Sequence, residues 1–344
     1  MKALSAGVLA AISCLALAPA APALAQQVLS VASDGGVYQA AERKAFYDPA
    51  AKQLGITIKD YTLSDITDIR AQVKAGAVQW DIAEVWGGLC EAAATEGLTE
   101  PLDYSVIKTD GIPKELVHPN WIGIAGYSTV LAYNKNKYGD NPPKNWADFF
   151  DTKKFPGTRA LYAGADSTEI ALMADGVPLD KIYPMDIDRA FKKLEELKPS
   201  IVSWWQSGSQ AMQLAKSQEA DMMSIWVARI DAAIKDGAPY AFTYNQAIFD
   251  VDCLVVPKGA KNKELAMKAI NLFVSPDLQA NLPMILPYGP VNQKAFETGK
   301  ITPEMTANSN TAPDNFKLEL VMDKAWWAAN NQKVQERWDA FLQK

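Results

Sequence analysis

Strand-like and helix-like segments alternate along the first third of this 344-residue chain, once an N-terminal leader is set aside. VLSVAS (28–33), ITIKDYT (56–62) and WDIAEVW (80–86) are predicted strands, and a helix-like segment follows each of them. This β-α-β-α-β order predicts a parallel sheet with helices on both faces. A sheet of this kind binds small molecules at the carboxyl ends of its strands.

A second alternation follows a long strand-like segment at 121–136. RALYAG (159–164), IVSWW (201–205) and ADMMSIW (220–226) are predicted strands separated by helix-like segments. The strand-like segment 248–259 is predicted to return to the first part of the chain. The sequence therefore predicts an α/β fold of two lobes joined by two crossings, with a small-molecule site in the cleft between them.

The first residues have the pattern of an export signal. MKALSAGVLAAISCLALAPAAPALAQQ contains one Lys, an apolar run and Ala23-Leu24-Ala25 before Gln26. This pattern predicts a signal peptide over 1–25 that is cleaved after Ala25, which places the mature chain in the periplasm. Lipid attachment at Cys14 is an alternative that requires an apolar core of only about a dozen residues.

The charge balance and the missing motifs exclude several functions. The chain has 34 Lys and Arg against 40 Asp and Glu, a formal net charge of −6, which disfavours nucleic acid and anionic membranes as partners. His118 is the one histidine, so a zinc site has no second His. No G-x-S-x-G elbow and no phosphate-binding glycine motif is present. We therefore expect no catalytic residues, no metal and no cofactor.

Two cysteines remain after the leader, Cys90 and Cys253. An even number of cysteines in an oxidising compartment predicts one disulfide, and two buried thiols are the alternative. The sequence contains no information on the distance between these residues, because they belong to different predicted strands and helices. Both interpretations stay open.

Asp166 and Glu169 lie at the start of a predicted helix in YAGADSTEIALM (162–173). As a local signal, this spacing is typical of a capping box, in which side chain and backbone bond reciprocally. As a functional signal, it places two carboxylates where they could bind a cation. The two interpretations are compatible, because a carboxylate can accept one backbone N–H and still face the cleft.

Three stretches resemble the spermidine/putrescine-type substrate-binding proteins of bacterial ABC importers, and the resemblance covers essentially the whole mature chain. They are YNKNKYGDNPPKNWADFFDTKKFPGTRALYAGADSTEI, ADMMSIWVARIDAAIKDGAPYAFTY, and IFDVDCLVVPKGAKNKELAMKAINLFVSPDLQANL followed by YGPVNQKA. The resemblance implies the two-lobed periplasmic-binding-protein fold of type II, with a mostly parallel sheet flanked by helices in each lobe. It implies that lobe 1 is formed by 26–125 and 250–310, and lobe 2 by 126–249 and 311–344.

The function implied by this resemblance is capture rather than catalysis. Such a protein, expected as a monomer, binds a small amine such as putrescine or spermidine and delivers it to a membrane permease. Polyamine binders bind an ammonium with an Asp-x-x-Glu at a helix start, which matches Asp166 and Glu169. Trp226 matches a Trp that packs on the alkyl chain, and Asp252 matches an Asp that holds an ammonium. Carboxylates offset the cost of burying a cation, and an aromatic face attracts it.

Other positions depart from the polyamine pattern. Asp250 lies where polyamine binders often carry an aromatic residue, and the alternation of Asp250 and Asp252 on a strand favours exposure to the cleft. Asp34 and Tyr38 are approximate counterparts of an acid and an aromatic residue that polyamine binders carry in the loop after the first strand. At the end of the third predicted strand, Trp86 stands where polyamine binders carry hydroxyl and Tyr side chains. The candidate ligand-binding residues are Asp34, Tyr38, Trp86, Asp166, Glu169, Trp226, Asp250 and Asp252.

These departures leave alternatives to a polyamine. An ω-amino acid is one, with its carboxylate bound by Arg229 or by the amides of Gly35-Gly36. Another amino-acid-like amine or an organophosphonate would keep the same fold. A different class of protein, an exported hydrolase with paired carboxylates as acid and base, is the remote alternative.

Overall fold

A computed structural model describes residues 27–164 and 166–343 of the chain. The predicted signal peptide, its cleavage site after Ala25 and the alternative at Cys14 lie outside the described residues. Within those two ranges, none of the helices combines the length and the apolar character that a membrane crossing needs.

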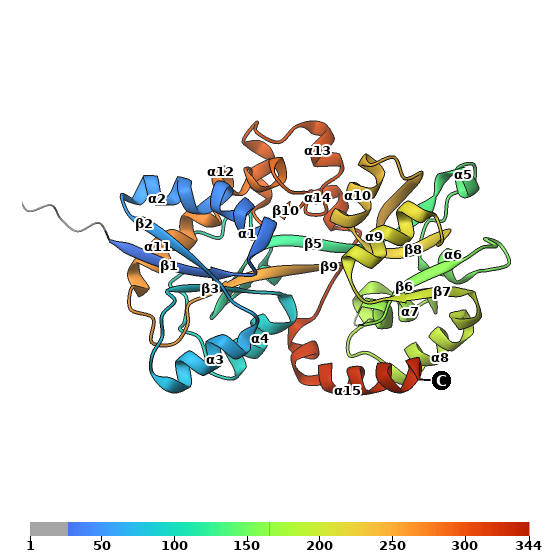
Figure 1. Cartoon of the computed structure of the whole chain (residues 1–344), viewed down its shortest axis with the longest axis horizontal. Helices are drawn as coiled ribbons and strands as arrows, with labels where there is room; N and C mark the ends of the chain where they lie inside the picture. Colours follow the sequence, from blue (N-terminus) through green and yellow to red (C-terminus); the bar gives the residue numbers. More distant parts are fainter. Residues whose placement is uncertain (1–26, 165, 344) are drawn as a thin grey trace, which may run out of the picture.

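The two strands that cross between the lobes are β5 (Trp121–Asn134) and β9 (Tyr240–Val255). They lie side by side along the middle of the molecule in Figure 1 and pair antiparallel over most of their length. The other strands are β1 (Val28–Ser33), β2 (Thr57–Thr62), β3 (Ile82–Val85), β4 (Val117–His118), β6 (Arg159–Tyr162), β7 (Ile201–Trp205), β8 (Met222–Trp226), β10 (Gly289–Pro290) and β11 (Leu320–Val321).

One sheet continues through both lobes, in the order β2-β1-β3-β9-β5-β8-β6-β7. β1 is parallel to β2 and β3 in lobe 1, and β6 is parallel to β7 and β8 in lobe 2. The crossing strands are antiparallel to the strands next to them, β3 and β8. The predicted type II fold, with a mostly parallel sheet in each lobe and two crossings, is therefore confirmed.

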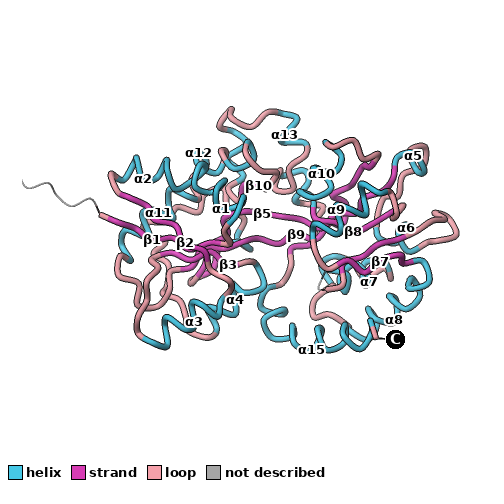
Figure 2. Tube along the Cα trace, in the orientation of Figure 1, coloured by secondary structure: helices cyan, strands magenta, loops and turns pink. Residues whose placement is uncertain are grey.

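Helices cover both faces of this sheet, which Figure 2 shows as a magenta band with cyan helices above and below it. The α-helices of the first part of the chain are α1 (Gly36–Glu42), α2 (Asp48–Leu54), α3 (Ile66–Ala75) and α4 (Gly87–Thr95). Between the crossings lie α5 (Lys135–Tyr138), α6 (Trp146–Phe150), α7 (Asp166–Ala174), α8 (Ile187–Leu197), α9 (Gly208–Ser217) and α10 (Val227–Lys235). After β9 come α11 (Lys263–Phe273), α12 (Pro276–Gln279), α13 (Pro303–Ala307), α14 (Pro313–Phe316) and α15 (Lys324–Leu342). Short 3₁₀ turns cover Lys114–Leu116, Leu179–Lys181, Lys198–Ser200, Leu282–Met284 and Gln293–Glu297.

One helix is irregular, and one local prediction differs from the structure. The helix that begins with α1 continues through a π-helical segment, Arg43–Tyr47, into α2. Pro49 lies in the first turn of α2, where the missing N–H costs little. β9 begins at Tyr240, well before the predicted start at 248, because its first half alternates polar and half-buried residues instead of forming an apolar run.

Each lobe has its own hydrophobic core. In lobe 1 the sheet separates two clusters, and successive residues of β3 enter opposite ones, Ile82 in one and Ala83 in the other. In lobe 2, α15 lies along α8, where the ring centroids of Trp338 and Phe191 are 5.1 Å apart. The end of the chain is thereby part of the core that supports α7.

The exact division of the chain into lobes stays a prediction. The predicted boundaries at 125/126 and 249/250 both fall inside crossing strands, β5 and β9. Since these strands pair with each other and with strands of both lobes, they belong to the connection itself.

Candidate ligand-binding site between the lobes

The candidate residues lie at the strand ends that face the connection between the lobes. Asp34 directly follows β1, and Trp86 directly follows β3. In lobe 2, Trp226 is the last residue of β8, and Asp166 begins α7 after β6. Because these strands are parallel within each lobe, their carboxyl ends share an edge, as expected of a ligand site in an α/β sheet.

Asp166 is buried, and its carboxylate accepts a hydrogen bond from the hydroxyl of Thr129 on β5. Burial raises the pKa of Asp166 to about 6, against the opposing effect of the hydrogen bonds from Thr129 and Trp226. The charge of Asp250 raises this pKa further. Thr129 on β5 pairs with Trp226 at the end of β8, so β5 brings Asp166 and Trp226 together.

Glu169 lies deeper in lobe 2, against the C-terminal helix. It is fully buried, and its Oε1 atom accepts hydrogen bonds of 2.7 Å from the Tyr183 hydroxyl and from the Trp327 indole N–H. Burial raises its pKa to about 8, and the charge of Asp166 adds to this shift. The carboxyls of both acids accept hydrogen bonds from side chains in distant parts of the chain, from Thr129 for Asp166 and from Tyr183 and Trp327 for Glu169.

In lobe 1, Tyr38 and Asp252 meet a residue that the sequence analysis did not select. The Tyr38 hydroxyl donates a hydrogen bond of 2.6 Å to Glu84, which is buried on β3. Burial raises the pKa of Asp252 well above its ordinary value, and the charges of Glu84 and Asp34 contribute. An acid inside the apolar strand WDIAEVW was the available signal for Glu84, because an ionised carboxyl in such a position is costly without a partner.

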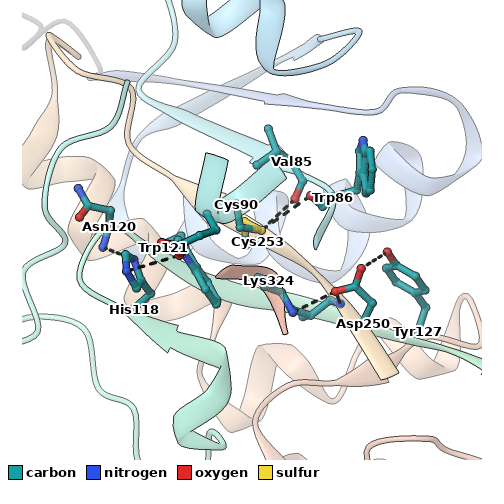
Figure 3. Close-up of a disulfide and its surroundings, with 12 residues drawn as sticks. Val85, Trp86, Cys90, His118, Asn120, Trp121, Tyr127, Asp250, Cys253 and Lys324 are labelled. Atoms are coloured by element: carbon teal, nitrogen blue, oxygen red, sulfur yellow. Dashed lines mark hydrogen bonds and ion pairs between the residues drawn. A yellow bond between two sulfur atoms is a disulfide. The ribbon is translucent and has the colours of Figure 1, made fainter. Parts of the chain in front are cut away.

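Asp250 is held by residues from two other elements (Figure 3). Its Oδ2 atom accepts a hydrogen bond of 2.9 Å from the Tyr127 hydroxyl, and its Oδ1 atom lies 3.0 Å from Nζ of Lys324. A Cβ atom at Gly87 would overlap this carboxylate, so glycine at the start of α4 makes room for it. Asp250 is therefore already paired with an internal ammonium group, whereas Asp252 has no ion pair within the part of the chain that the structure describes.

Aromatic rings flank the acids on both sides. Trp86 precedes α4 and is 47% exposed, unusual for a tryptophan of this chain. Trp226 packs edge-on against Trp205 with 5.2 Å between ring centroids. Tyr38 lies against Tyr288, which no sequence signal indicated, at 5.1 Å. These rings provide flat apolar surfaces next to the carboxylates.

Arg229 on α10 places a positive charge near this group of acids. The pKa of Tyr288 is raised to about 12, chiefly by burial. The charge of Asp252 also raises this pKa, and the charge of Arg229 lowers it. Tyr288 thus lies within electrostatic range of both an acid of lobe 1 and the guanidinium of lobe 2. Tyr288 also lines a pocket of about 160 Å³, together with Val227, Asp231 and Glu304 among others.

The two cysteines of the mature chain form a disulfide, which decides the open alternative of the sequence analysis. Cys90 on α4 and Cys253 on β9 have Cα atoms 6.2 Å apart (Figure 3). The bond joins the helix that begins beside Trp86 to the strand that carries Asp250 and Asp252. In 27–164 and 166–343, no three His, Cys, Asp or Glu side chains converge to hold a metal ion.

Comparison with known proteins identifies the family. Residues 45–313 match the family described as bacterial extracellular solute-binding protein. The chain belongs to this family. Its members and structural neighbours are substrate-binding proteins of ABC transporters, which bind solutes and are not enzymes. This protein is therefore an extracellular solute-binding protein of an ABC transporter, and some of its relatives are named as periplasmic proteins.

Two of the relatives extend over nearly the whole chain, and a third covers less of it. A solved ABC transporter substrate-binding protein from Bradyrhizobium japonicum is 44% identical, with a TM-score of 0.84, and the match covers 91% of this chain and 99% of that chain. The γ-aminobutyric acid-binding protein of Pseudomonas aeruginosa is 34% identical over 344 residues, 96% of this chain and 95% of the relative. A spermidine/putrescine-binding periplasmic protein of Haemophilus influenzae is 25% identical over 264 residues, 72% of each chain.

The resemblance to polyamine binders thus identified the class of transport protein, and a polyamine as its ligand is not confirmed. The γ-aminobutyric acid-binding relative matches at higher identity and over more of the chain than the polyamine-binding one. The eight candidate site residues stay predictions. At Asp250, which departs from the polyamine pattern, the structure shows an ion pair with Lys324.

Proposed function

We propose that the protein binds a small amine that also carries a carboxylate, an ω-amino acid such as γ-aminobutyrate, and delivers it to its ABC permease. The observation that supports this ligand is the position of Arg229, whose Nε atom and the ring of Trp226 both lie against Gly208 at the start of α9. The 34% identity to a γ-aminobutyric acid-binding protein agrees with this assignment.

The two ends of such a ligand need different partners. The ammonium requires carboxylates, which Asp252 and Glu84 offer from lobe 1 and Asp166 from lobe 2. The carboxylate requires a cation with several N–H donors, and the planar guanidinium of Arg229 can bind both of its oxygens at once. A ligand with two ammonium ends would bring one of them close to Arg229, which costs free energy.

The two-lobed fold supplies the capture step. Proteins of this kind close around their solute by rotation of one lobe relative to the other about the connecting segments. Here the connecting segments are β5 and β9, and β9 carries Asp250 and Asp252. Closure on a ligand would bring the acids of lobe 1 and Arg229 of lobe 2 around the same small molecule, and opening would release it to the permease.

A polyamine is the second candidate, because acids that match those of polyamine binders lie in both lobes, Asp166 in lobe 2 and Asp252 in lobe 1. Calorimetric titration of the refolded, ligand-free mature protein with γ-aminobutyrate, putrescine and spermidine distinguishes the two. We expect binding of γ-aminobutyrate at micromolar or lower concentration and much weaker binding of both polyamines. Tight binding of a polyamine without binding of γ-aminobutyrate would overturn the proposal.

A further inference from the structure

Lys324 places an ammonium group among the acids at the connection between the lobes. It is the first residue of α15, and its Nζ atom lies 3.0 Å from Oδ1 of Asp250 on β9 (Figure 3). Asp250 is the one acid within ion-pair distance of this lysine in the ranges 27–164 and 166–343. Both side chains are buried, so dissolved salt screens the charges of the pair little.

The carboxylate of Asp250 is held in one position by its surroundings. Its Oδ2 atom accepts a hydrogen bond of 2.9 Å from the Tyr127 hydroxyl, and its Oδ1 atom accepts one of 2.8 Å from the N–H of Val251. The carboxylate lies directly against Gly87, where a Cβ atom would overlap it. Since Gly87 follows the exposed Trp86, this acid lies at the strand end where lobe 1 faces the cleft.

The register of the crossing strands places Asp250 between two other acids of the candidate site. Asp252 lies two residues further along β9, which is about 7 Å. In the other direction, Thr129 lies two residues along β5 from Tyr127, the residue opposite Asp250, and donates a hydrogen bond to Asp166. Burial raises the pKa of Asp166 and of Asp252, and the charge of Asp250 raises both further. Asp250 is therefore the middle acid of three along the connection.

We propose that Lys324 is a specificity-determining residue, whose ammonium occupies the middle acid in place of the second ammonium of a diamine. Lys324 acts through Asp250 and does not itself contact the ligand. This inference rests on the proposed function and deepens it, because it assigns the discrimination between one ammonium and two to a buried ion pair contributed by the C-terminal helix.

The selectivity follows from the charge that a ligand meets. Lys324 neutralises Asp250 before any ligand arrives, and the acids on either side, Asp166 and Asp252, are left for a single ammonium. The second ammonium of a diamine finds no free negative charge at Asp250 and is repelled by Lys324. At the effective dielectric constant of a protein, a unit charge about 7 Å away changes the affinity for an ion by about tenfold or more.

Calorimetric titration of the ligand-free mature protein with γ-aminobutyrate and with putrescine tests this role. Lys324→Met removes the ammonium and keeps most of the side-chain volume, so the charge of Asp250 becomes available to a ligand. We expect this variant to bind putrescine about tenfold or more tightly than the wild type does, and γ-aminobutyrate no more tightly. The measured quantity is the ratio of the two affinities, because a loss of stability alone would weaken both ligands alike.

Two further variants separate the charge from other effects of the substitution. Lys324→Met/Asp250→Asn has the same new side chain but no carboxylate at the middle position, so the gain in putrescine affinity should disappear. Lys263→Met is the matched control, since Lys263 also lies 3.0 Å from an acid, Glu100, but belongs to α11 outside the site. It removes the same charge from the protein and should leave the ratio as in the wild type.

The outcomes distinguish this role from the proposed function. Should Lys324→Met not fold, Lys324→Gln replaces it, because the amide can donate a hydrogen bond to the buried Asp250 while its charge stays free. An unchanged ratio, or a gain that persists in the double variant, would overturn the role of Lys324 and leave the proposed function standing. A wild type that binds neither ligand would overturn the proposed function, and a gain of putrescine binding in Lys324→Met that the double variant lacks would still support the role of Lys324.

Discussion

Lys324 and Asp250 form a buried ion pair in which Nζ lies 3.0 Å from Oδ1, with 5% and 6% of the two side chains exposed. Lys324 is the first residue of α15, and Asp250 lies on the crossing strand β9. The ammonium of Lys324 also lies 5.9 Å from the ring centre of Trp121, at the start of the other crossing strand. The C-terminal helix is therefore attached to both crossing strands at one point.

Replacing Lys324 by methionine keeps most of the side-chain volume and removes the charge. Since Asp250 would remain buried without its cation, we expect Lys324→Met to lower the free energy of unfolding by about 3–5 kcal/mol. Urea unfolding followed by circular dichroism measures the change. The double variant Lys324→Met/Asp250→Asn should recover a large part of the loss; a double variant as unstable as the single one would show that packing, and not charge, is responsible.

The disulfide between Cys90 and Cys253 closes a loop with a sequence separation of 163, which contains the whole of the chain between the crossings. Cross-links over long loops stabilise chiefly by restricting the unfolded chain. We expect Cys90→Ala/Cys253→Ala to lower the free energy of unfolding by about 2–4 kcal/mol. A reducing agent should shift the urea midpoint of the wild type in the same direction and leave the double variant unchanged, and a wild type insensitive to reduction would contradict the prediction.

Glu169 gives the unliganded protein a defined dependence on pH. Its pKa is 4.5 ordinarily and about 8 in the folded chain, chiefly because of burial, so the folded state binds this proton more tightly than the unfolded state. The corresponding stability is fully present below pH 4.5 and is lost as the pH rises through about 8. The melting temperature of the wild type should therefore fall as the pH rises from 4.5 to about 8, and we expect this fall to be smaller in Glu169→Gln.

Glu100 provides the control of opposite sign for that pH series. A backbone hydrogen bond from Gly259 and the ammonium of Lys263 lower its pKa, so its contribution is present above its ordinary pKa of 4.5 and lost only as the pH falls. Glu100→Gln should therefore leave the slope of melting temperature against pH nearly unchanged between pH 6 and 8. An equal flattening in both variants would show that the effect at Glu169 is not due to its buried proton.

Arg229 should distinguish an ω-amino acid from a diamine. We expect Arg229→Gln to weaken γ-aminobutyrate binding by about 1.5–3 kcal/mol, because a hydrogen bond to a charged group is lost. Putrescine has no carboxylate for Arg229 to bind, so its affinity should stay the same or rise. Calorimetry with both ligands measures the difference, and an unchanged unfolding midpoint is expected because Arg229 is exposed. Equal losses for both ligands would contradict this role.

Much of the fold followed from local patterns. The alternation that predicted strands at 28–33, 201–205 and 220–226 corresponds closely to β1, β7 and β8. The pattern of apolar residues did not predict the first half of β9, because most of the residues there are half-buried and form no apolar run. Pairing with β5 holds these residues in a strand. Strand pairing of this kind depends on a partner more than a hundred residues away and leaves no local periodicity to detect.

The candidate site was less accessible from the sequence. Asp166, Trp226 and Asp252 were selected by resemblance, and the structure places them at the connection of the lobes. Glu84 was missed although an acid inside an apolar strand is a readable signal. Lys324 carried no signal at all, because a lysine at the start of a helix is ordinary until its partner is known.

The sequence by itself determined that the chain alternates strands and helices, that two such units are joined by two crossings, and which acids and aromatic residues end the strands. These properties depend on side-chain periodicity and on neighbours a few residues away. Only the tertiary structure decided that Asp250 is paired with Lys324, that Cys90 and Cys253 are bonded, and that Tyr38 donates a hydrogen bond to the buried Glu84. The physical reason is that charge pairing acts over a few ångströms in space, and the register of the sheet and the packing of α15 set which distant residues come that close.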